Sequence, residues 1–240
     1  MIGRLLGAVQ FLTVVPIPGR TASPGRAAPF FPLIGAALGA TCGLAFEICR
    51  KPLGGSLAAL IGVSAAIILS GALHEDGLAD VADALRAGRT RDKMLAILKD
   101  SRIGAYGAVA LIVCICVRWQ ALEHMQMNAV LGLASCLALS RSSLVVLGAI
   151  TVPVGHGLGA SFSEALTPAV SVSVAVQVVI AATLCGWRGV PMLLATTAII
   201  VVARSYFTRR LGGVNGDCLG ATCLTVESAN LLLLAWHRST

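Results

Sequence analysis

The stretch His74–Gly104 reads HEDGLADVADALRAGRTRDKMLAILKDSRIG and is the most polar part of a chain that is otherwise mostly apolar. It holds six of the eleven acidic residues of the protein and six of its eighteen lysines and arginines. Long apolar runs lie on both sides of it, so a membrane bundle built from those runs would present this stretch at one face. The stretch therefore predicts both where the chain leaves the membrane and where its polar chemistry is concentrated.

The composition around this stretch is typical of an integral membrane protein. Hydrophobic residues make up 57% of the 240 residues and charged residues only 12%, whereas soluble domains have about a quarter charged residues. The mean hydropathy is +0.87. We therefore predict an all-α, polytopic helical bundle that forms a single membrane domain over residues 1–240 and has the lipid bilayer as its surroundings.

The charge and the cysteines exclude several other classes of protein. The formal net charge is +7, but the basic residues are scattered over short loops without an aromatic-studded groove, so nucleic acid is not an expected partner. The eight cysteines form no CxxC pair and most lie in apolar runs, so neither a disulfide framework nor a zinc site is expected. The sequence leaves open whether the protein is a homo-oligomer.

Seven apolar segments are long enough, or nearly so, to cross the roughly 30 Å hydrocarbon layer. They cover residues 29–48, 53–73, 104–122, 129–150, 168–185, 190–208 and 220–236. Residues 5–15 form a shorter apolar run, and we predict a short N-terminal interfacial or re-entrant helix that is ended by Pro16 and Pro18. Gly35, Gly39 and Gly43 recur at a spacing of four residues, which predicts close helix packing.

The lysines and arginines in the loops and near the segment ends predict the orientation of the bundle. When the loops are counted alternately, one face receives eleven of them, including Arg20, and the other receives five, which are Arg50, Lys51, Arg118, Arg188 and Arg238. The first face includes the N-terminal region, residues 74–104 and residues 209–219. Because cytoplasmic loops carry the excess of basic residues, we predict that this face is cytoplasmic.

Three carboxylates fall on one side of the acidic stretch if residues 76–85 are helical. At about 100° per residue, Asp76, Asp80 and Asp83 lie within an arc of roughly 60°. Carboxylates placed so closely repel one another unless a cation lies between them. Mg²⁺ takes a few carboxylate oxygens and leaves its other positions to water and phosphate groups. We predict a Mg²⁺ site here; the alternative is a solvated acidic helix surface.

Two further segments carry groups suited to the same site. Lys99, Asp100 and Arg102 lie just before the next apolar segment, where Asp100 is a candidate ligand and the two cations are candidates for binding phosphate oxygens. Asp217 lies between the last two apolar segments, on the membrane face that also receives residues 74–104. It is therefore a further candidate metal ligand.

Two charged residues lie deep inside apolar segments, and such residues commonly mark function. Arg141 is followed by a long apolar run, and Glu227 lies between TCLTV and LLLLAW. The predicted orientation puts both in the cytoplasmic half of the membrane, where they either pair with each other or converge beneath the acidic stretch. A purely structural ion pair is the alternative. His74, which opens the acidic stretch, is a further candidate for ligand binding.

Sequence patterns at several places resemble a known family. The matching segments are QFLT (residues 10–13), FPLIG (31–35), HEDGLAD (74–80), KDSRIG (99–104), Ser140-Arg141 and Gly216-Asp217 with Glu227. Together they resemble the adenosylcobinamide-GDP ribazoletransferase family, also called cobalamin synthase, over nearly the whole chain. HEDGLAD and KDSRIG are the most specific of these segments.

The resemblance implies a Mg²⁺-dependent enzyme of the bacterial cytoplasmic (inner) membrane whose active site faces the cytoplasm. The family joins adenosylcobinamide-GDP to α-ribazole or its 5′-phosphate, gives adenosylcobalamin or its phosphate, and releases GMP. A transfer of this kind depends more on positioning and charge neutralisation than on covalent chemistry by the protein. The expected cofactor is Mg²⁺, and the expected partners are these two substrates.

The implied reaction suggests roles for the candidate residues. The aspartates of the acidic stripe, joined by Asp100 or Asp217, would hold one or two Mg²⁺ on the pyrophosphate. Asp83 or Asp100 is the preferred general base for the attacking hydroxyl. Lys99, Arg102 and Arg141 would neutralise phosphate charge. Substrate or cofactor binding is also expected of Glu227 and His74.

Two other functions are consistent with parts of the sequence. A CDP-alcohol phosphotransferase also places clustered aspartates on membrane helices, but its usual pattern has an arginine where this chain has Asp80. A cation transporter would use Arg141 and Glu227 as a relay through the membrane. The acidic residues cluster at one face, however, and no inverted repeat is visible.

Overall fold

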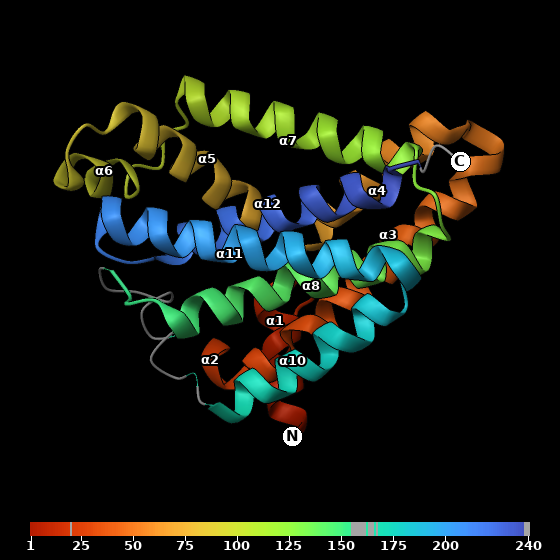
Figure 1. The fold of residues 1–240 in the computed structure, drawn as a ribbon, viewed down its shortest axis with the longest axis horizontal. Coiled ribbons are helices and arrows are strands. Elements are labelled where there is room, and N and C mark those ends of the chain that lie inside the picture. Colours follow the sequence, from red (N-terminus) through yellow and green to blue (C-terminus); the bar gives the residue numbers. More distant parts are fainter. Residues whose placement is uncertain (20, 155–161, 163–165, 167, 238–240) are drawn as a thin grey trace.

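The computed structural model describes residues 1–19, 21–154, 162, 166 and 168–237. Regular structure among these residues is helical, apart from one isolated bridge between Pro153 and Val214 (Figure 1). The elements in chain order are α1 (Ile2–Leu12), α2 (Pro24–Ala27), η1 (Ala28–Phe30), α3 (Phe31–Leu53), α4 (Gly55–Leu69), α5 (Leu73–Ala87), α6 (Arg91–Ile97), α7 (Ala105–Glu123), α8 (Ala129–Ile150), α10 (Pro168–Thr183), η2 (Gly186–Arg188), α11 (Gly189–Leu211) and α12 (Gly216–Ala235). The prediction of an all-α bundle is confirmed.

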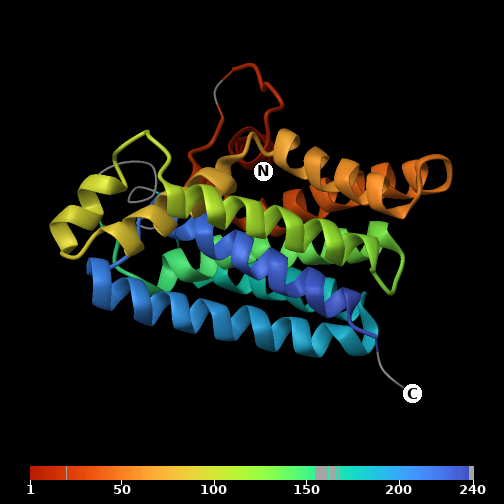
Figure 2. The same ribbon diagram turned by 90° about the horizontal axis from the view of Figure 1, so that it is seen from above.

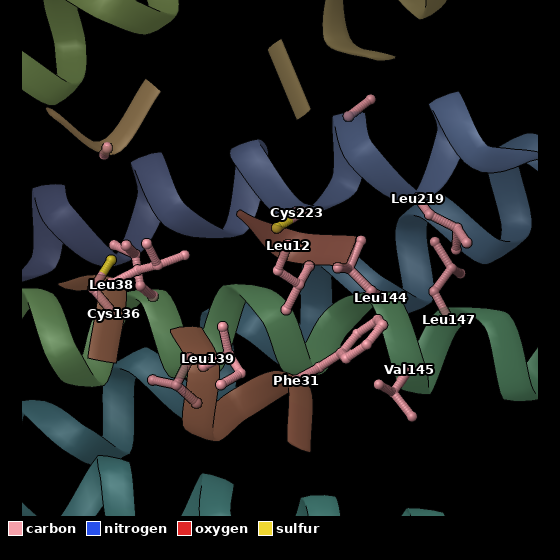
Figure 3. Packing of buried hydrophobic residues seen from close by; sticks show 14 of the residues in the cluster. Leu12, Phe31, Leu38, Cys136, Leu139, Leu144, Val145, Leu147, Leu219 and Cys223 are labelled. Atoms are coloured by element: carbon pink, nitrogen blue, oxygen red, sulfur yellow. The ribbon is translucent and has the colours of Figure 1, made fainter. Parts of the chain in front are cut away.

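Helix α8 forms the centre of the bundle and is buried along most of its length. It packs against α3 on one side and against α12 on another. Leu139 and Leu144 of α8, Phe31 of α3 and Leu219 of α12 belong to one cluster of buried apolar side chains (Figure 3). The side chains that face outward from α7 and α11 are largely apolar and exposed, as expected where helices contact lipid.

The glycines at spacing four pack α3 directly onto the backbone of α8. A Cβ atom would lie 2.4 Å from the Leu137 oxygen at Gly35 and 2.1 Å from the Leu133 oxygen at Gly39. At Gly43 it would lie 2.5 Å from the Ala129 oxygen. No larger residue fits at these distances, so the predicted role of these glycines in helix packing is confirmed.

Five helical segments of the described chain are long and apolar enough to cross a membrane. They are Pro24–Leu53, Ala105–Glu123, Ala129–Ile150, Gly186–Leu211 and Gly216–Ala235. A sixth span exists only if α4 and α5 are counted together, although the chain bends by 89° between them. The protein is therefore an integral membrane protein, but the predicted number of seven spans is not confirmed.

The difference in number comes from two predicted segments and has a simple physical reason. The segment predicted at 53–73 forms α4, whose 15 residues extend only about 22 Å at 1.5 Å per residue. The segment predicted at 168–185 forms α10, whose 16 residues are also too short for a hydrocarbon layer of about 30 Å. Hydropathy alone does not distinguish such short helices from full spans. The N-terminal run forms the 11-residue helix α1, which also does not pass as a span.

The turn between α4 and α5 directs the acidic stretch into the bundle. Gly71 and Ala72 both have a positive φ, of 63° and 55°, and the left-handed conformation costs a non-glycine residue roughly 1–2 kcal/mol. Beyond this turn α5 lies between α7 and α12 (Figure 1). The first half of the acidic stretch is therefore a helix packed between two others, as the arrangement of its carboxylates on one side requires.

The polar residues gather at one end of the molecule. Figure 2 shows α5 and α6 at the opposite end from the α3–α4 turn and the end of α12. The connection between α11 and α12 lies at the same end as α5 and α6, and α6 contacts α11. Residues 74–104 and Asp217 therefore share one end of the bundle. Arg20 and Arg238, which contributed to the charge count, lie outside the described residues.

Candidate functional site

The acidic side of α5 carries Asp76 and Asp80, four residues apart. Asp76 is exposed and Asp80 is half-buried. The Asp80 carboxylate experiences the negative charges of Asp76, Asp217 and Asp83. No ion pair within the described part of the chain joins Asp76, Asp80 or Asp217 to a lysine or arginine. The site therefore concentrates negative charge that no ion pair of the described residues balances.

Glycine lets Asp217 approach this stripe. A Cβ atom at Gly77 would lie 2.9 Å from the Asp217 backbone oxygen and 3.0 Å from its Cα atom. The first turn of α12 therefore lies directly against α5. The Asn215 amide donates a hydrogen bond of 2.7 Å to Asp217 Oδ2, and its own oxygen accepts one from the backbone N–H of Cys218 at 3.0 Å. The side chain of Asp217 is thus fixed at a helix N-terminus, where a carboxylate is favoured.

Asp83, the third member of the predicted stripe, binds the start of α7. It is 7% exposed, and the backbone N–H groups of Gly104 and Gly107 donate hydrogen bonds of 2.7 and 3.0 Å to its two oxygens. A Cβ atom at either glycine would lie 2.4 Å from the carboxylate. Both oxygens of Asp83 thus satisfy amides at the N-terminus of α7 that have no partner within the helix.

The KDSRIG segment lies between α6 and α7 and carries an exposed ion pair. Arg102 Nη2 donates to Asp100 Oδ2 at 2.7 Å, and Arg102 Nε donates to Oδ1 at 2.9 Å. This hydrogen bonding lowers the pKa of the Asp100 carboxyl to about 2, so Asp100 is ionised at neutral pH. Lys99 is exposed beside it. These three candidate residues remain accessible from water.

A buried network of four charges joins α5, α7, α8 and α12. Arg118 Nη1 donates to Glu75 Oε1 at 2.8 Å, and Arg118 Nη2 lies 2.7 Å from Glu227 Oε1. Arg141 Nη1 donates to the second oxygen of Glu227 and to Ser140 Oγ. All four charged side chains are buried. Two arginines and two glutamates balance, as buried charges require.

The three residues predicted to bind substrate or cofactor all lie in or beside this network. Arg141 and Glu227 form the ion pair that was one of the predicted arrangements. His74 is 2% exposed and interacts electrostatically with both of them. Its Nε2 atom has no hydrogen-bond partner among the described residues. The network therefore lies beneath the acidic stripe and holds the helix that carries it.

Two members of this network, Glu75 and Arg118, are not among the site residues predicted from the sequence. The charge count assigns Arg118 to a loop at the other membrane face, which is wrong because Arg118 lies inside α7 and is 2% exposed. A signal was present, since Arg118 follows the apolar run LIVCICV within the predicted 104–122 span. The criterion that identified Arg141 as an intramembrane charge applies equally to Arg118. Glu75 gave no comparable signal, because acidic neighbours surround it in sequence.

The chemistry of the acidic stripe fits a hard divalent cation. Asp76, Asp80 and Asp217 supply carboxylate oxygens, but no three His, Cys, Asp or Glu side chains of the described residues are grouped closely enough to form a complete ligand set. Mg²⁺ commonly takes one or two carboxylates and fills its other positions with water and substrate phosphates. These residues therefore fit a Mg²⁺ that is bound together with a phosphate-bearing substrate.

Comparison with known sequences identifies the family. A family model described as cobalamin-5-phosphate synthase matches residues 4–235. The chain belongs to this family. The resemblance inferred from the HEDGLAD and KDSRIG segments is thereby confirmed, and the protein is a transferase of cobalamin biosynthesis.

Individual members of the cobalamin-5-phosphate synthase family are similar along their whole length. A Ralstonia nicotianae protein named adenosylcobinamide-GDP ribazoletransferase is 34% identical over 97% of this chain and 95% of its own. Proteins of the same name from Bradyrhizobium diazoefficiens and Escherichia coli are 36% and 33% identical, over 98% and 94% of this chain and 94% and 96% of theirs. No solved structure matches the chain.

Proposed function

We propose that this enzyme joins adenosylcobinamide-GDP to α-ribazole or its 5′-phosphate in a Mg²⁺-dependent reaction that releases GMP. The relatives' names give the two reacting partners. The structural observation that supports the proposal is the packing of the first turn of α12, which carries Asp217, against α5, which carries Asp76 and Asp80; none of these carboxylates has an ion-pair partner among the described residues. A pyrophosphate ester with its Mg²⁺ would satisfy these carboxylates.

The proposed reaction is a substitution at phosphorus. A ribose hydroxyl oxygen of the α-ribazole forms a bond to the phosphorus on the cobinamide side of the pyrophosphate. The bond from that phosphorus to the bridging oxygen breaks, and GMP leaves with the electron pair. The hydroxyl proton passes to a base. Mg²⁺, when bound, neutralises the phosphate oxygens and so makes the phosphorus easier to attack.

The chain's own residues divide into three roles in this proposal. Asp76, Asp80 and Asp217 hold the cation. Asp83 is a positioning residue, because both of its oxygens accept hydrogen bonds from the start of α7. Of the two candidate bases, Asp83 and Asp100, only Asp100 is accessible. We therefore propose that Asp100 accepts the proton of the attacking hydroxyl.

Phosphate binding and proton transfer are linked through Arg102. When its guanidinium turns to a phosphate oxygen, it leaves Asp100, whose pKa then rises from about 2 toward its ordinary value. Asp100 becomes a better proton acceptor at the moment when substrate is bound. Lys99 adds a second positive charge beside it. The buried network of Arg118, Arg141 and their glutamates holds α5 in place beneath these groups.

We also propose that the α5–α6 end faces the cytoplasm in the bacterial inner membrane. The excess of lysine and arginine in the segments at this end supports that orientation. Nucleotide-bearing substrates are charged and water-soluble, so an active site open to the cytoplasm would receive them directly.

The test is GMP release by purified protein in detergent with adenosylcobinamide-GDP, α-ribazole and increasing Mg²⁺. Asp80→Asn is expected to lower the rate by at least about 100-fold, since even groups that only support a metal ligand commonly contribute 10- to 100-fold. Saturating Mg²⁺ is expected to restore only part of the loss. Near-normal GMP release from Asp80→Asn would rule out the metal assignment.

Asp92→Asn provides a matched control for that experiment. Asp92 is an exposed carboxylate in the first turn of α6, at the same end of the molecule but outside the acidic stripe. The same chemical change at Asp92 is expected to leave the rate of GMP release and the Mg²⁺ concentration it requires within about twofold of those of the unchanged protein, because most surface substitutions have small effects. A loss as large as that of Asp80→Asn would show a general effect of charge at this end.

A further inference from the structure

A second polar site lies beside the acidic stripe, where the end of α5, the start of α7 and the end of α11 meet. It is an open pocket of about 440 Å³, a size within the range of small-molecule sites. The residues that line it are Leu85, Arg86, Gly88, Arg89, Tyr106 and Arg210. Neither the family assignment nor the proposed roles of the aspartates involves these residues.

Three guanidinium groups line the pocket, those of Arg86, Arg89 and Arg210. In the described ranges, no Asp or Glu forms an ion pair with Arg86, Arg89 or Arg210. The Nε atom of Arg210 is buried and has no hydrogen-bond partner among the described residues, and its Nη2 donates to the sulfur of Met94 at 3.6 Å. Three such groups around one cavity attract an anion.

The walls of the pocket are held in place by specific contacts. A Cβ atom at Gly88 would lie 2.3 Å from the side chain of Met94, so only glycine lets α6 fold back so closely against the end of α5. Arg91 Nε donates to the Leu211 carbonyl at 2.8 Å, which joins α6 to the end of α11 next to Arg210. Arg86 lies over the Tyr106 ring, 5.7 Å from its centroid.

We propose that this arginine pocket binds a phosphate-ester anion. Guanidinium groups match phosphate oxygens in geometry and stay charged at any physiological pH. Tyr106 and Arg210 lie at the ends of two membrane-spanning helices, so the pocket is at the level of lipid headgroups as well as open to water. The phosphate belongs either to a soluble nucleotide or pyrophosphate, or to an acidic phospholipid. This site does not depend on the Mg²⁺ assignment of the acidic stripe.

The test measures binding directly and without metal. The full-length protein is purified in a neutral detergent with EDTA, which prevents metal-mediated binding at the aspartates. One arm titrates inorganic pyrophosphate by calorimetry, and the other measures retention of phosphatidylglycerol by native mass spectrometry. Arg86→Gln and Arg210→Gln are expected to weaken binding roughly 10-fold or more, because each variant loses a charged hydrogen-bond donor to the anion.

Lys51→Gln is the matched control, since it also removes one positive charge but from an exposed position at the opposite end of the molecule. It is expected to bind both probes like the unchanged protein. Loss of pyrophosphate binding in the two arginine variants identifies a soluble phosphate as the ligand, and loss of phosphatidylglycerol retention identifies a lipid headgroup. If both variants bind both probes as Lys51→Gln does, the proposal is wrong.

Since GMP release is not the readout, this outcome is separate from a failure of the proposed function. Arg210→Lys extends the test, because it keeps the charge but loses the planar fork. Arg210→Lys is expected to bind the anion more weakly than the unchanged protein does but more strongly than Arg210→Gln does. A native thermal unfolding profile for each variant shows that the fold is retained.

Discussion

Arg118 connects three helices through a single guanidinium group. From α7 it reaches Glu75 on α5 at 2.8 Å and Glu227 on α12 at 2.7 Å, and all three side chains are buried. Its replacement leaves two carboxylates in an apolar interior with only one remaining arginine nearby. The effect of one residue therefore extends to the helix that carries the aspartates.

We predict that Arg118→Met lowers the stability of the protein by about 3–5 kcal/mol, the usual effect of breaking a buried ion pair. The measurement is thermal unfolding in detergent at one fixed heating rate, because membrane proteins commonly unfold irreversibly. Arg50→Gln is the control, since it breaks an exposed pair with Glu47 at 3.7 Å, where about 1 kcal/mol or less is expected. Equal unfolding temperatures for the two variants would contradict a stabilising role for the buried network.

The contact between α5 and α12 decides whether the carboxylates of the two helices meet. Two glycines make this contact, and they differ in how much space each leaves for a side chain. A Cβ atom at Gly77 would lie 2.9 Å from the Asp217 backbone oxygen, whereas one at Gly220 would lie 3.4 Å from the nearest atom, His74 Cα. A methyl group at Gly77 would therefore push α5 and α12 apart, whereas one at Gly220 would make a contact close to the ordinary van der Waals distance.

We predict that Gly77→Ala lowers the rate of GMP release by at least about tenfold and raises the Mg²⁺ concentration needed for half the maximal rate. Displacements near 1 Å can cost on the order of 100-fold in rate. Gly220→Ala is expected to stay close to the unchanged protein. Both substitutions replace glycine by alanine within a helix, so their intrinsic effect on helix formation is the same. Equal activities in the two variants would show that the α5–α12 distance does not matter.

For the whole molecule, the asymmetric distribution of charge predicts which end faces the cytoplasm. We predict that Ser101→Cys, in the exposed segment before α7, reacts with a membrane-impermeant maleimide only after the inner membrane of spheroplasts is opened. Lys51→Cys, at the opposite end, is expected to react in intact spheroplasts. The unchanged protein corrects for its eight native cysteines. Labelling of Ser101→Cys in intact spheroplasts would show that this end faces the outside and that the predicted orientation is wrong.

The family model covers residues 4–235, and helices α3, α10, α11 and α12 pack against α8. That residues 1–240 act as one domain stays a prediction, and the oligomeric state stays open.

The sequence by itself determined the class of the fold, the family and the position of the acidic stripe. The reason is that hydropathy and helical periodicity are local properties. Four residues make about one helical turn, so Asp76 and Asp80 share a face wherever the helix is placed. The glycine spacing of α3 predicted close packing for the same reason.

Only the tertiary structure decided which distant residues meet. Glu75 and Arg118 are 43 residues apart, and Arg141 and Glu227 are 86 apart. Their contacts depend on how helices pack and on the 89° bend after α4, which results from two residues with positive φ. The same packing turned Asp83 toward the amides of α7 and away from the role of a free carboxylate. Side-chain partners of this kind follow from the arrangement of whole helices, which no local pattern encodes.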